Sequence, residues 1–370
     1  MCIFAHYARV CVNDIAMDIE LFSDILKIDS TSGKEAALAD FLQERLLTSS
    51  CRVERFDVGD GTSNLLFSWG EPDIVFCSHL DTVPPYIAPS MEKAGEHDVK
   101  YCGRGTCDAK GQIFSMYTAC KALCEQGKRN FGLLLLAGEE TGSYGAKAFR
   151  DKYPGGKYVI VGEPTDNCMA SASKGTKAFE ITFRGVPFHS GYPQHGESAV
   201  LYFNDFVNAL RSYRFNDDEI LGETTWNIGK LVSDNPQNIL SEQLTFRLYF
   251  RTTFASDSQV SDLLENISGG NAKYKFDADK AAKWQLRMSV KALGGDTPTR
   301  YTVLDGFPAK AVSFGSDAPQ LTNFENKILC GPGSILVAHR SDEHIMLSDM
   351  EKAVENYIKM YYALSEKIKL

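Results

Sequence analysis

Three short apolar stretches mark the first half of the chain, and acidic or histidine side chains follow each of them. The stretches cover residues 74–78, 131–137 and 158–161, and a segment with helical spacing of apolar residues, 111–126, separates the first two. Nearly continuous apolar runs of this length are typical of strands that are buried on both faces. Alternation of such strands with helices predicts an α/β fold in which helices sandwich a mostly parallel sheet.

Helical spacing of apolar residues also predicts two helices before this sheet. The first begins near Asp18, so we expect the residues before Met17 to be an extension, with Met17 as an alternative start. The second covers residues 34–47, where Ser32 and Glu35 have the spacing of a capping box. In that motif the serine hydroxyl caps the first turn of the helix.

The pattern changes near Gly175, where alternating apolar and polar positions replace the continuous runs. Segments of strand and helix character then follow in a β-α-β-β-α-β order. They are the strand 177–185, the helix 197–213, the strands 225–233 and 244–253, the helix 258–267, and alternating stretches around Tyr274 and Met288. This order predicts a small antiparallel α+β domain, residues 176–292, inserted into the first domain.

The pattern of the first domain resumes after the insertion and closes with a helix over residues 348–368. The sequence therefore predicts one domain made of residues 1–175 and 293–370 and a second made of residues 176–292. A chain of 370 residues, of which 44% are hydrophobic and 24% charged, is long enough to build both cores.

Charge and cysteine usage exclude several classes of protein. The net charge of −9 argues against a nucleic-acid partner, because such partners require a positive surface. The ten cysteines contain no CxxC pair, so we expect free thiols in a reducing compartment rather than a structural zinc site or a disulfide framework. No run approaches the roughly 20 apolar residues that span a bilayer. We expect a cytoplasmic protein without a membrane segment.

The first polar pair follows the first apolar stretch, in the segment SHLDTVPP, which holds His79 and Asp81. A histidine that binds a metal usually donates its second ring N–H to a carboxylate, and Asp81 is close enough in sequence to serve. Asp108 lies in the glycine-flanked segment GRGTCDAKG, just before a predicted helix. Its spacing does not match a phosphate-binding loop, so we do not expect nucleotide binding, and the simplest alternative is an N-cap aspartate in a glycine-rich turn.

Two adjacent carboxylates, Glu139 and Glu140, end the leucine-rich stretch in AGEETG. Buried neighbouring carboxylates repel one another, and a bound cation removes that repulsion. Glu163 in VGEPT ends the third stretch, and His339 follows the apolar segment ILVA near the end of the chain. His344 competes with His339 as a ligand, but its position fits an exposed helix start better.

The charges of these side chains indicate a site for two divalent metal ions. Asp108, Glu140 and Glu163 bring three negative charges, and a bridging hydroxide would supply the fourth that neutralises two such ions. Two histidines and three carboxylates suit zinc, with cobalt or manganese as substitutes. The carboxyl ends of parallel strands share one edge of a sheet, so we expect these ligands to meet there.

With these segments together, the chain resembles the co-catalytic zinc amidohydrolase and peptidase family. That family contains acetylornithine deacetylase, succinyl-diaminopimelate desuccinylase, carboxypeptidase G and the aminoacylases. The shared segments are SHLDTVP, GRGTCDAKG, AGEETG, GEPT and GPGSILVAHRSDE, and they follow the family's order over nearly the whole chain. One departure is Cys107, which stands where relatives often have a small apolar residue.

The resemblance implies two zinc ions per subunit with shared ligands. His79, Asp108 and Glu163 would hold one ion, and Asp108, Glu140 and His339 the other. Glu139 falls on the family's general base, and Asp81 on the carboxylate behind the first histidine. Residues 176–292 correspond to a lid and dimerisation domain, which implies a homodimer.

The same resemblance implies a set of substrate-binding residues. His189 in GVPFHSGYP matches a lid histidine that stabilises the oxyanion in the partner's site. Arg251 resembles a lid arginine that binds a substrate carboxylate, with Arg247 as the nearby alternative. Asn238 and Ser316 stand where relatives contact their substrates.

The implied function is hydrolysis of the amide bond of a small N-acyl amino acid. The segments GEPTDN and GPGSILVAH favour acetylornithine deacetylase, with the desuccinylase next. A dipeptidase or carboxypeptidase would use the same metal ligands. A metal-free binding protein of the same fold is the non-enzyme alternative, and the retention of every predicted ligand argues against it.

Overall fold

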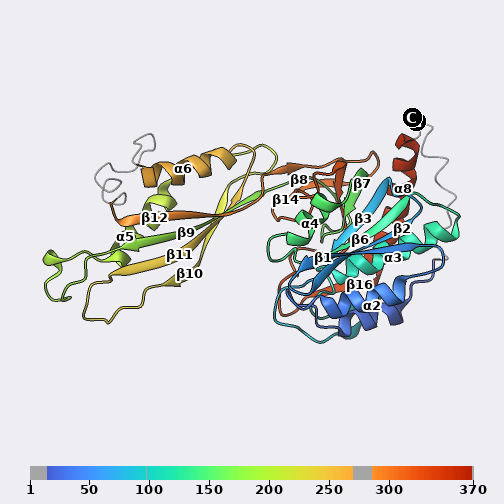
Figure 1. Ribbon diagram of the computed structural model, residues 1–370, viewed down its shortest axis with the longest axis horizontal. Coiled ribbons are helices and arrows are strands. Elements are labelled where there is room, and N and C mark those ends of the chain that lie inside the picture. The colour runs from blue at the N-terminus through green and yellow to red at the C-terminus, as the bar shows by residue number, and fades with distance from the viewer. Residues whose placement is uncertain (1–14, 97, 270–285, 369–370) are drawn as a thin grey trace. The chain divides into compact units, whose positions relative to one another are not determined.

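A computed structural model describes residues 15–96, 98–269 and 286–368 (Figure 1). The chain divides into two compact units. The first consists of Met1–Ser171, Tyr301–Lys310 and Ser316–Leu370, and the second of Ala172–Arg300 and Ala311–Gly315. The second unit therefore extends beyond both ends of the predicted insertion and includes a short segment of the returning chain.

The first unit is built on a six-stranded sheet with the order β1-β2-β6-β3-β7-β15 (Figure 1). Its strands are β1 (Arg52–Gly59), β2 (Thr62–Trp69), β3 (Ile74–His79), β6 (Phe131–Leu136), β7 (Gly156–Val161) and β15 (Phe324–Leu329). The four strands from β6 to β15 are parallel, whereas β1 and β2 add an antiparallel edge. The predicted α/β class with a mostly parallel sheet is confirmed.

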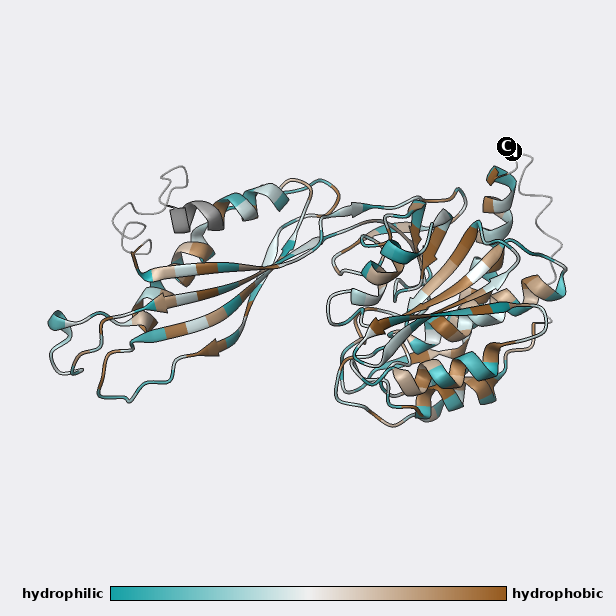
Figure 2. Ribbon diagram, viewed as in Figure 1, coloured by the Kyte–Doolittle hydropathy of each residue, from teal (hydrophilic) through white to brown (hydrophobic). Residues whose placement is uncertain are grey.

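Both faces of this sheet are covered, as the continuous apolar runs require. Every residue of β3 and β6 is buried, and both strands are mainly apolar, although β3 ends in Ser78 and His79. Figure 2 shows brown, hydrophobic stretches on the strands of this sheet. One hydrophobic cluster joins alternate residues of the sheet, such as Phe76 and Leu133, to four helices. These helices are α1 (Ile19–Lys27), α2 (Ala36–Leu46), α3 (Lys110–Glu125) and α8 (Leu347–Ile368). A fifth helix, α4 (Tyr144–Lys152), packs Phe149 against Phe56 of β1.

The predicted helices form with small differences at their ends, but the predicted capping box is wrong. Asp18 caps α1 by accepting the N–H of Leu21 at 3.0 Å. At α2 the N-cap is Glu35, and it makes no capping hydrogen bond with its side chain. The hydroxyl of Ser32 instead donates to Asp81 at 2.9 Å. Ser32 therefore serves a distant loop rather than the helix that follows it.

Short strands complete the first unit and the passage to the second. One three-stranded sheet has the order β16-β5-β4 and another the order β13-β8-β14. Their bounds are β4 (Ser90–Ala94), β5 (Asp98–Cys102), β8 (Met169–Ser173), β13 (Thr299–Arg300), β14 (Ala309–Val312) and β16 (His344–Met346). His344 lies in β16 and not at the exposed helix start that the sequence indicates.

The second unit has the elements β9, α5, β10, β11, α6 and β12 in that sequence. Their bounds are β9 (Gly175–Arg184), α5 (Ala199–Ser212), β10 (Thr225–Val232), β11 (Gln243–Thr252), α6 (Asp257–Gly269) and β12 (Met288–Gly294), with a short 3₁₀ turn, η2, at Pro193–His195. The sheet order is β10-β11-β9-β12, and all its pairs are antiparallel. The stretch expected around Tyr274 lies outside the described residues.

A separate apolar core holds the second unit together. Phe183, Phe206 and Phe246 are fully buried and contact one another between the sheet and α5. Alternate residues of β11 are buried, which is the pattern of a sheet with one covered face. Within the described ranges, no helix combines the length and the apolar character needed to cross a membrane.

Candidate metal centre

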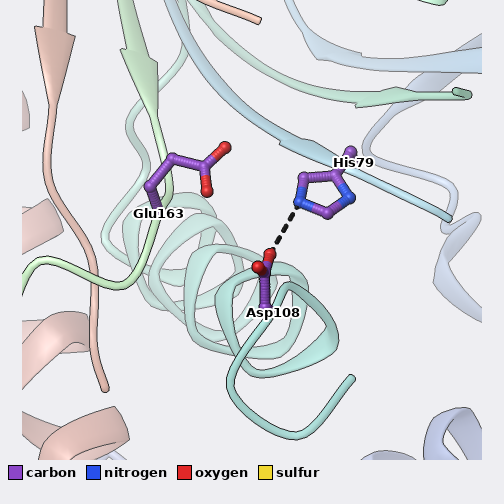
Figure 3. A group of neighbouring side chains, drawn as sticks. All are labelled: His79, Asp108 and Glu163. Carbon is purple, nitrogen blue, oxygen red and sulfur yellow. Dashed lines mark hydrogen bonds and ion pairs between the residues drawn. The ribbon is translucent and has the colours of Figure 1, made fainter. Parts of the chain in front are cut away.

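His79, Asp108 and Glu163 form the first group of possible metal ligands (Figure 3). His79 ends β3, Glu163 follows β7, and Asp108 lies in the loop before α3. Strands β3 and β7 are parallel neighbours, so their carboxyl ends bring the two side chains to one edge of the sheet. The ligand atoms of the group all lie within 4.8 Å of one another. The structure therefore brings together the three residues that the sequence predicts as ligands of one metal ion.

The two ring nitrogens of His79 have different partners. Nδ1 lies 2.9 Å from the backbone carbonyl oxygen of Asp81, which requires a proton on Nδ1. A neutral ring then directs the lone pair of Nε2 toward an oxygen of Asp108 only 3.0 Å away. Two lone pairs repel at that distance unless a proton or a metal ion lies between them. The arrangement is therefore suited to a cation at Nε2.

Asp108, Glu140 and His339 form the second group. Nε2 of His339 lies 2.9 Å from Glu140 Oε1 and 3.2 Å from Asp108 Oδ2. The other oxygen of Asp108, Oδ1, faces His79. Asp108 thus presents one carboxylate oxygen to each histidine, which is the geometry expected of a ligand that bridges two metal ions.

His339 does not follow a strand, although the apolar run before it resembles one. Residues 335–338 form turns, and His339 has a left-handed backbone with a φ of 64°. Its side chain is about half exposed, at 49%. A turn rather than a strand end therefore directs this ring toward Glu140. His344, the alternative ligand, has its Nδ1 2.7 Å from the carbonyl oxygen of Asp342 and belongs to neither group.

The carboxylate of Asp81 holds the turn that carries the two glutamates. Its Oδ1 accepts the N–H of Glu139 at 2.9 Å, and its Oδ2 accepts the N–H of Glu140 at 3.1 Å. Oδ1 lies 3.5 Å from Nδ1 of His79, farther than the backbone carbonyl of the same residue. The sequence predicts that Asp81 orients His79, and in the structure Asp81 also accepts hydrogen bonds from the turn after β6. Asp81 couples the loop after β3 to the turn after β6.

Carboxylates outnumber cationic side chains in this centre, and the pKa values reflect it. Burial raises the pKa values of Glu139 and Glu163 well above the usual range, and it also raises the pKa of Glu140. Hydrogen bonds with Asp108 and Glu140 raise the pKa of His339 to about 10. Burial would raise the pKa of Asp108, but its hydrogen bonds with His339 and His79 outweigh burial and lower it. The centre is short of positive charge.

These observations fit bound metal ions. Glu163 Oε1 is buried and accepts no hydrogen bond from any described residue, so one oxygen is left for a ligand. Imidazole nitrogens and carboxylate oxygens are donors that zinc prefers. Positive ions would also compensate the excess of buried carboxylates. That the residues of the two groups bind metal stays a prediction.

A comparison with protein families decides where the chain belongs. Residues 75–363 match the peptidase family M20/M25/M40. The chain belongs to this family. The predicted relationship to the zinc amidohydrolase and peptidase family is therefore confirmed. As an M20 peptidase, the protein is a metal-dependent hydrolase of the peptidase and amidohydrolase class.

Individual relatives agree with this placement. A probable carboxypeptidase of Emericella nidulans is 30% identical over 99% of this chain and 94% of its own length. One of Aspergillus oryzae is 31% identical over 93% and 86%. The structure of a tripeptidase from Staphylococcus aureus has a TM-score of 0.77 at 17% identity, covering 94% of this chain and 98% of that one. This last likeness concerns the fold.

The predicted substrate-binding residues of this M20 peptidase fall on both units. In the second unit, the N–H of Ser190 donates to the Asn238 carbonyl at 2.9 Å, which brings Asn238 beside the exposed His189. Arg251 lies on β11 with its guanidinium 5.2 Å from the ring centroid of Tyr249. Arg247, its alternative, lies 3.7 Å from a carboxylate oxygen of Glu180. Of the two cations, Arg247 is therefore near a carboxylate, whereas Arg251 contacts an aromatic ring.

Ser316 lies in the first unit and is buried. Its Oγ accepts the N–H of Ala318 at 3.3 Å. The next residue, Asp317, is also buried, and its charge adds to the raised pKa of Glu139 and Glu163. Of the segment singled out by sequence, the carboxylate of Asp317 therefore has the clearer relation to the metal centre.

Sequence reasoning missed three residues that support the ligands of this M20 peptidase. They are Ser32, which donates to Asp81, and the buried ion pair of Arg104 with Glu343. Arg104 lies in GRGTCDAKG, which also holds Asp108, and Glu343 lies in GPGSILVAHRSDE, which also holds His339. Charged residues inside such glycine-rich segments are the signal that could have indicated them, because a buried charge requires a partner.

Proposed function

We propose that this M20 peptidase is a two-zinc hydrolase that cleaves an amide bond next to a free carboxylate, in a short peptide or an N-acyl amino acid. The observation that carries this proposal is the placement of Asp108, whose two oxygens each face a different histidine. His79 and Glu163 complete one site, and Glu140 and His339 the other.

Metal ions in this centre would lower the pKa of water and polarise the carbonyl of the substrate. The chain supplies the proton transfer. Glu139 follows β6 beside the proposed ligand Glu140, and burial raises its pKa, the direction that favours uptake of a proton by a general base. In the proposed mechanism, a carboxylate oxygen of Glu139 takes the proton of the attacking water and delivers it to the leaving amine.

Asp81 contributes by keeping Glu139 in place. Its hydrogen bond to the backbone N–H of Glu139 fixes the start of the turn from which the glutamate extends. Small displacements of a catalytic group cost large factors in rate, so an anchored turn is an advantage. For the substrate, we propose that His189 donates to the oxyanion, that Arg251 binds the carboxylate, and that Asn238 and Ser316 add contacts.

Two substrate classes compete. Relatives that match most of the chain are named probable carboxypeptidases, which favours a peptide with a free C-terminal carboxylate. The segments GEPTDN and GPGSILVAH favour an N-acyl amino acid of the acetylornithine or succinyl-diaminopimelate type. Both classes present an amide near a carboxylate, so the proposed centre serves either.

The test is a hydrolysis screen of the purified protein with zinc or cobalt added. The panel contains dipeptides and tripeptides beside acetyl, succinyl and formyl amino acids. We expect turnover of at least one class, its loss with a chelator and its return with zinc. A protein that binds no zinc at saturation, and hydrolyses nothing, would support the metal-free binding protein instead.

Recognition of the carboxylate has its own test, with a matched control on the same strand. Arg251→Ala should raise KM about 10-fold or more for substrates with a free carboxylate, since a charged hydrogen bond contributes about 1.5–3 kcal/mol. It should leave KM nearly unchanged for the corresponding amides. Arg247→Ala, four residues away, removes a cation paired with Glu180 and should affect neither. Equal effects of Arg251→Ala on acids and amides would contradict the assignment.

We also propose a homodimer formed through the second unit. Exposed apolar side chains support this proposal: Val200 and Leu201 on α5 are 40% and 63% exposed, and Leu231 and Val232 at the end of β10 are 51% and 60% exposed. Strand β10 is also an edge of its sheet, and open edges pair readily. Sedimentation equilibrium should give twice the mass of one chain.

A further inference from the structure

Glu343 is a buried carboxylate whose two oxygens are both fully used. Its side chain has no exposed surface. Oε1 accepts three backbone N–H groups, from Gly105 at 2.9 Å and from Cys107 and Asp108 at 3.1 Å each. Oε2 accepts Nη1 of Arg104 at 2.5 Å. One carboxylate therefore gathers the whole loop that carries the bridging residue Asp108.

Arg104 extends this contact to the loop of Pro85 and to a second point on the segment that carries Glu343. Its Nη1 also donates to the backbone carbonyl of Arg340 at 3.2 Å, and its Nε donates to the carbonyl of Pro85 at 3.3 Å. Arg340 directly follows His339, and Pro85 lies in the segment that begins with His79. The side chain is only 3% exposed, so water competes little for these bonds.

The two residues thus touch the three loops that present His79, Asp108 and His339. Glu343 lies on the same segment as His339, and a backbone bond from the Gly103 N–H to the Glu343 carbonyl, 3.0 Å, adds to the connection. These loops come from places far apart in the chain, and the side chains of Arg104 and Glu343 connect them. Their relative positions set the distance between the metal ligands.

We propose that Arg104 and Glu343 form a positioning pair that fixes the spacing of the metal ligands and so sets the affinity of the centre for zinc. Neither side chain touches metal or substrate in this proposal. A buried ion pair often adds little to net stability, because both charges lose their hydration. The observed contacts instead hold the loops of the proposed ligands at fixed distances from one another. The inference rests on the proposed two-zinc centre.

Glu343→Gln tests the pair with almost no change in volume. The amide has one acceptor oxygen, which can face either the three backbone N–H groups or Arg104, and its NH₂ then opposes the other set of donors. We expect the loop of Asp108 to lose its fixed position and zinc affinity to fall about 10- to 100-fold, the range seen when partners of metal ligands are changed. Chelator competition measures this affinity without reference to turnover.

A second variant covers the case in which the first fails to fold. Arg104→Lys keeps the charge opposite Glu343, but an ammonium group cannot reproduce the planar fork that bonds Arg340 and Pro85 at once. We expect a smaller loss of zinc affinity, about threefold to tenfold, with unchanged circular dichroism. Asp98→Asn is the matched control, since Asp98 also accepts backbone N–H groups and joins distant segments, β5 and α8.

The outcomes separate the two proposals. If the natural protein binds no zinc, the two-zinc centre itself is wrong. If it binds zinc and both Glu343→Gln and Arg104→Lys bind it equally well, the positioning pair is wrong although the centre stands. An equal loss of affinity in Asp98→Asn would also overturn the pair, because the effect would then follow from general destabilisation.

Discussion

At the scale of single residues, Glu139 is the proposed general base, and its substitution tests catalysis apart from metal binding. It is adjacent to the predicted ligand Glu140 but belongs to neither group of possible ligands. Glu139→Gln keeps the volume and removes the group that accepts the proton. We expect kcat to fall by about 10²- to 10⁴-fold, the usual contribution of a general base, with two equivalents of zinc still bound.

Elemental analysis and kinetics of the same sample check this prediction. Glu71→Gln is the control, because the Glu71 side chain is 90% exposed and should affect neither quantity. Turnover at the natural rate in Glu139→Gln would remove the residue from the role of base. Loss of zinc together with activity would make it a ligand instead.

Glu35 gives a second prediction at this scale, on the pH dependence of stability. It is fully buried, its Oε1 accepts the hydroxyl of Tyr144, and its Oε2 has no partner among the described residues. Burial raises its pKa above the ordinary value of a glutamate, 4.5, and the nearby charge of Asp81 adds to the rise. The unfolded chain therefore ionises first as the pH rises.

Ionisation in the unfolded state favours unfolding. The ionisation of Glu35 therefore leaves the free energy of unfolding unchanged below about pH 4.5 and lowers it above that pH. Glu35→Gln cannot ionise. We expect the free energy of unfolding of this variant, compared with that of the natural protein, to increase from pH 4.5 to pH 7. Urea unfolding at both pH values measures the difference. A difference that does not change with pH would show that Glu35 ionises equally in the folded and unfolded states.

At the scale of elements, the turn after β6 depends on a glycine. Gly138 has a φ of 70°, and a β-carbon there would lie 1.7 Å from the ring of Tyr144. The hydroxyl of Tyr144 donates to Glu35 and lies 3.2 Å from the hydroxyl of Thr62, so the ring cannot move freely. Substitution at Gly138 should displace the turn that carries both glutamates.

We expect Gly138→Ala to cost about 1–3 kcal/mol more than Gly142→Ala, the usual cost of overpacking. Gly142 is the matched control, because it also has a positive φ, 106°, but a β-carbon there meets no described atom within 4 Å. Urea unfolding measures both variants. Equal losses would mean that backbone strain alone, and not the contact with Tyr144, makes the glycine necessary.

Elements differ in how well the sequence predicts them, and burial explains the difference. Strands β3 and β6 are buried on both faces by apolar side chains, so their hydrophobic runs predict them directly. Strand β2 is equally buried but contains polar residues, and Asn64 is satisfied by the backbone of Gly145 and Ala137. The apolar run of this strand, residues 65–67, is short, and the hydrogen-bond partners of Asn64 come from distant parts of the chain.

At the scale of the whole molecule, the two units have separate hydrophobic cores, and the predicted ligands all belong to the first. A ligand stabilises the part of a protein that binds it, by about 2.7 kcal/mol at a concentration 100 times its Kd. We therefore expect a chelator to lower the melting temperature of the first unit in calorimetry and to leave the second unchanged.

Zinc in excess should reverse the shift, and calcium, which prefers oxygen ligands, serves as the control ion. A chelator that shifts no transition would contradict a metal centre in the first unit. A single transition that shifts as a whole would show that the two units unfold together.

The sequence by itself determined the class of fold and the types of residue that gather at the candidate metal centre. Continuous apolar runs specify buried parallel strands, and a histidine or acid at each strand end is visible without coordinates, as His79, Glu140 and Glu163 illustrate. These signals are local, because both the run and the residue that ends it are neighbours in the chain.

Only the tertiary structure decided how those residues are held. The division of Asp108 between two histidines, the anchoring of Glu139 by Asp81, and the bonds from Arg104 and Glu343 to three loops join residues tens to hundreds of positions apart. Hydrogen bonds of this kind depend on where the folded backbone places each donor and acceptor. Local periodicity carries no information on that placement. The sequence around Ser32 therefore predicts a helix cap, whereas in the structure the Ser32 hydroxyl donates to Asp81.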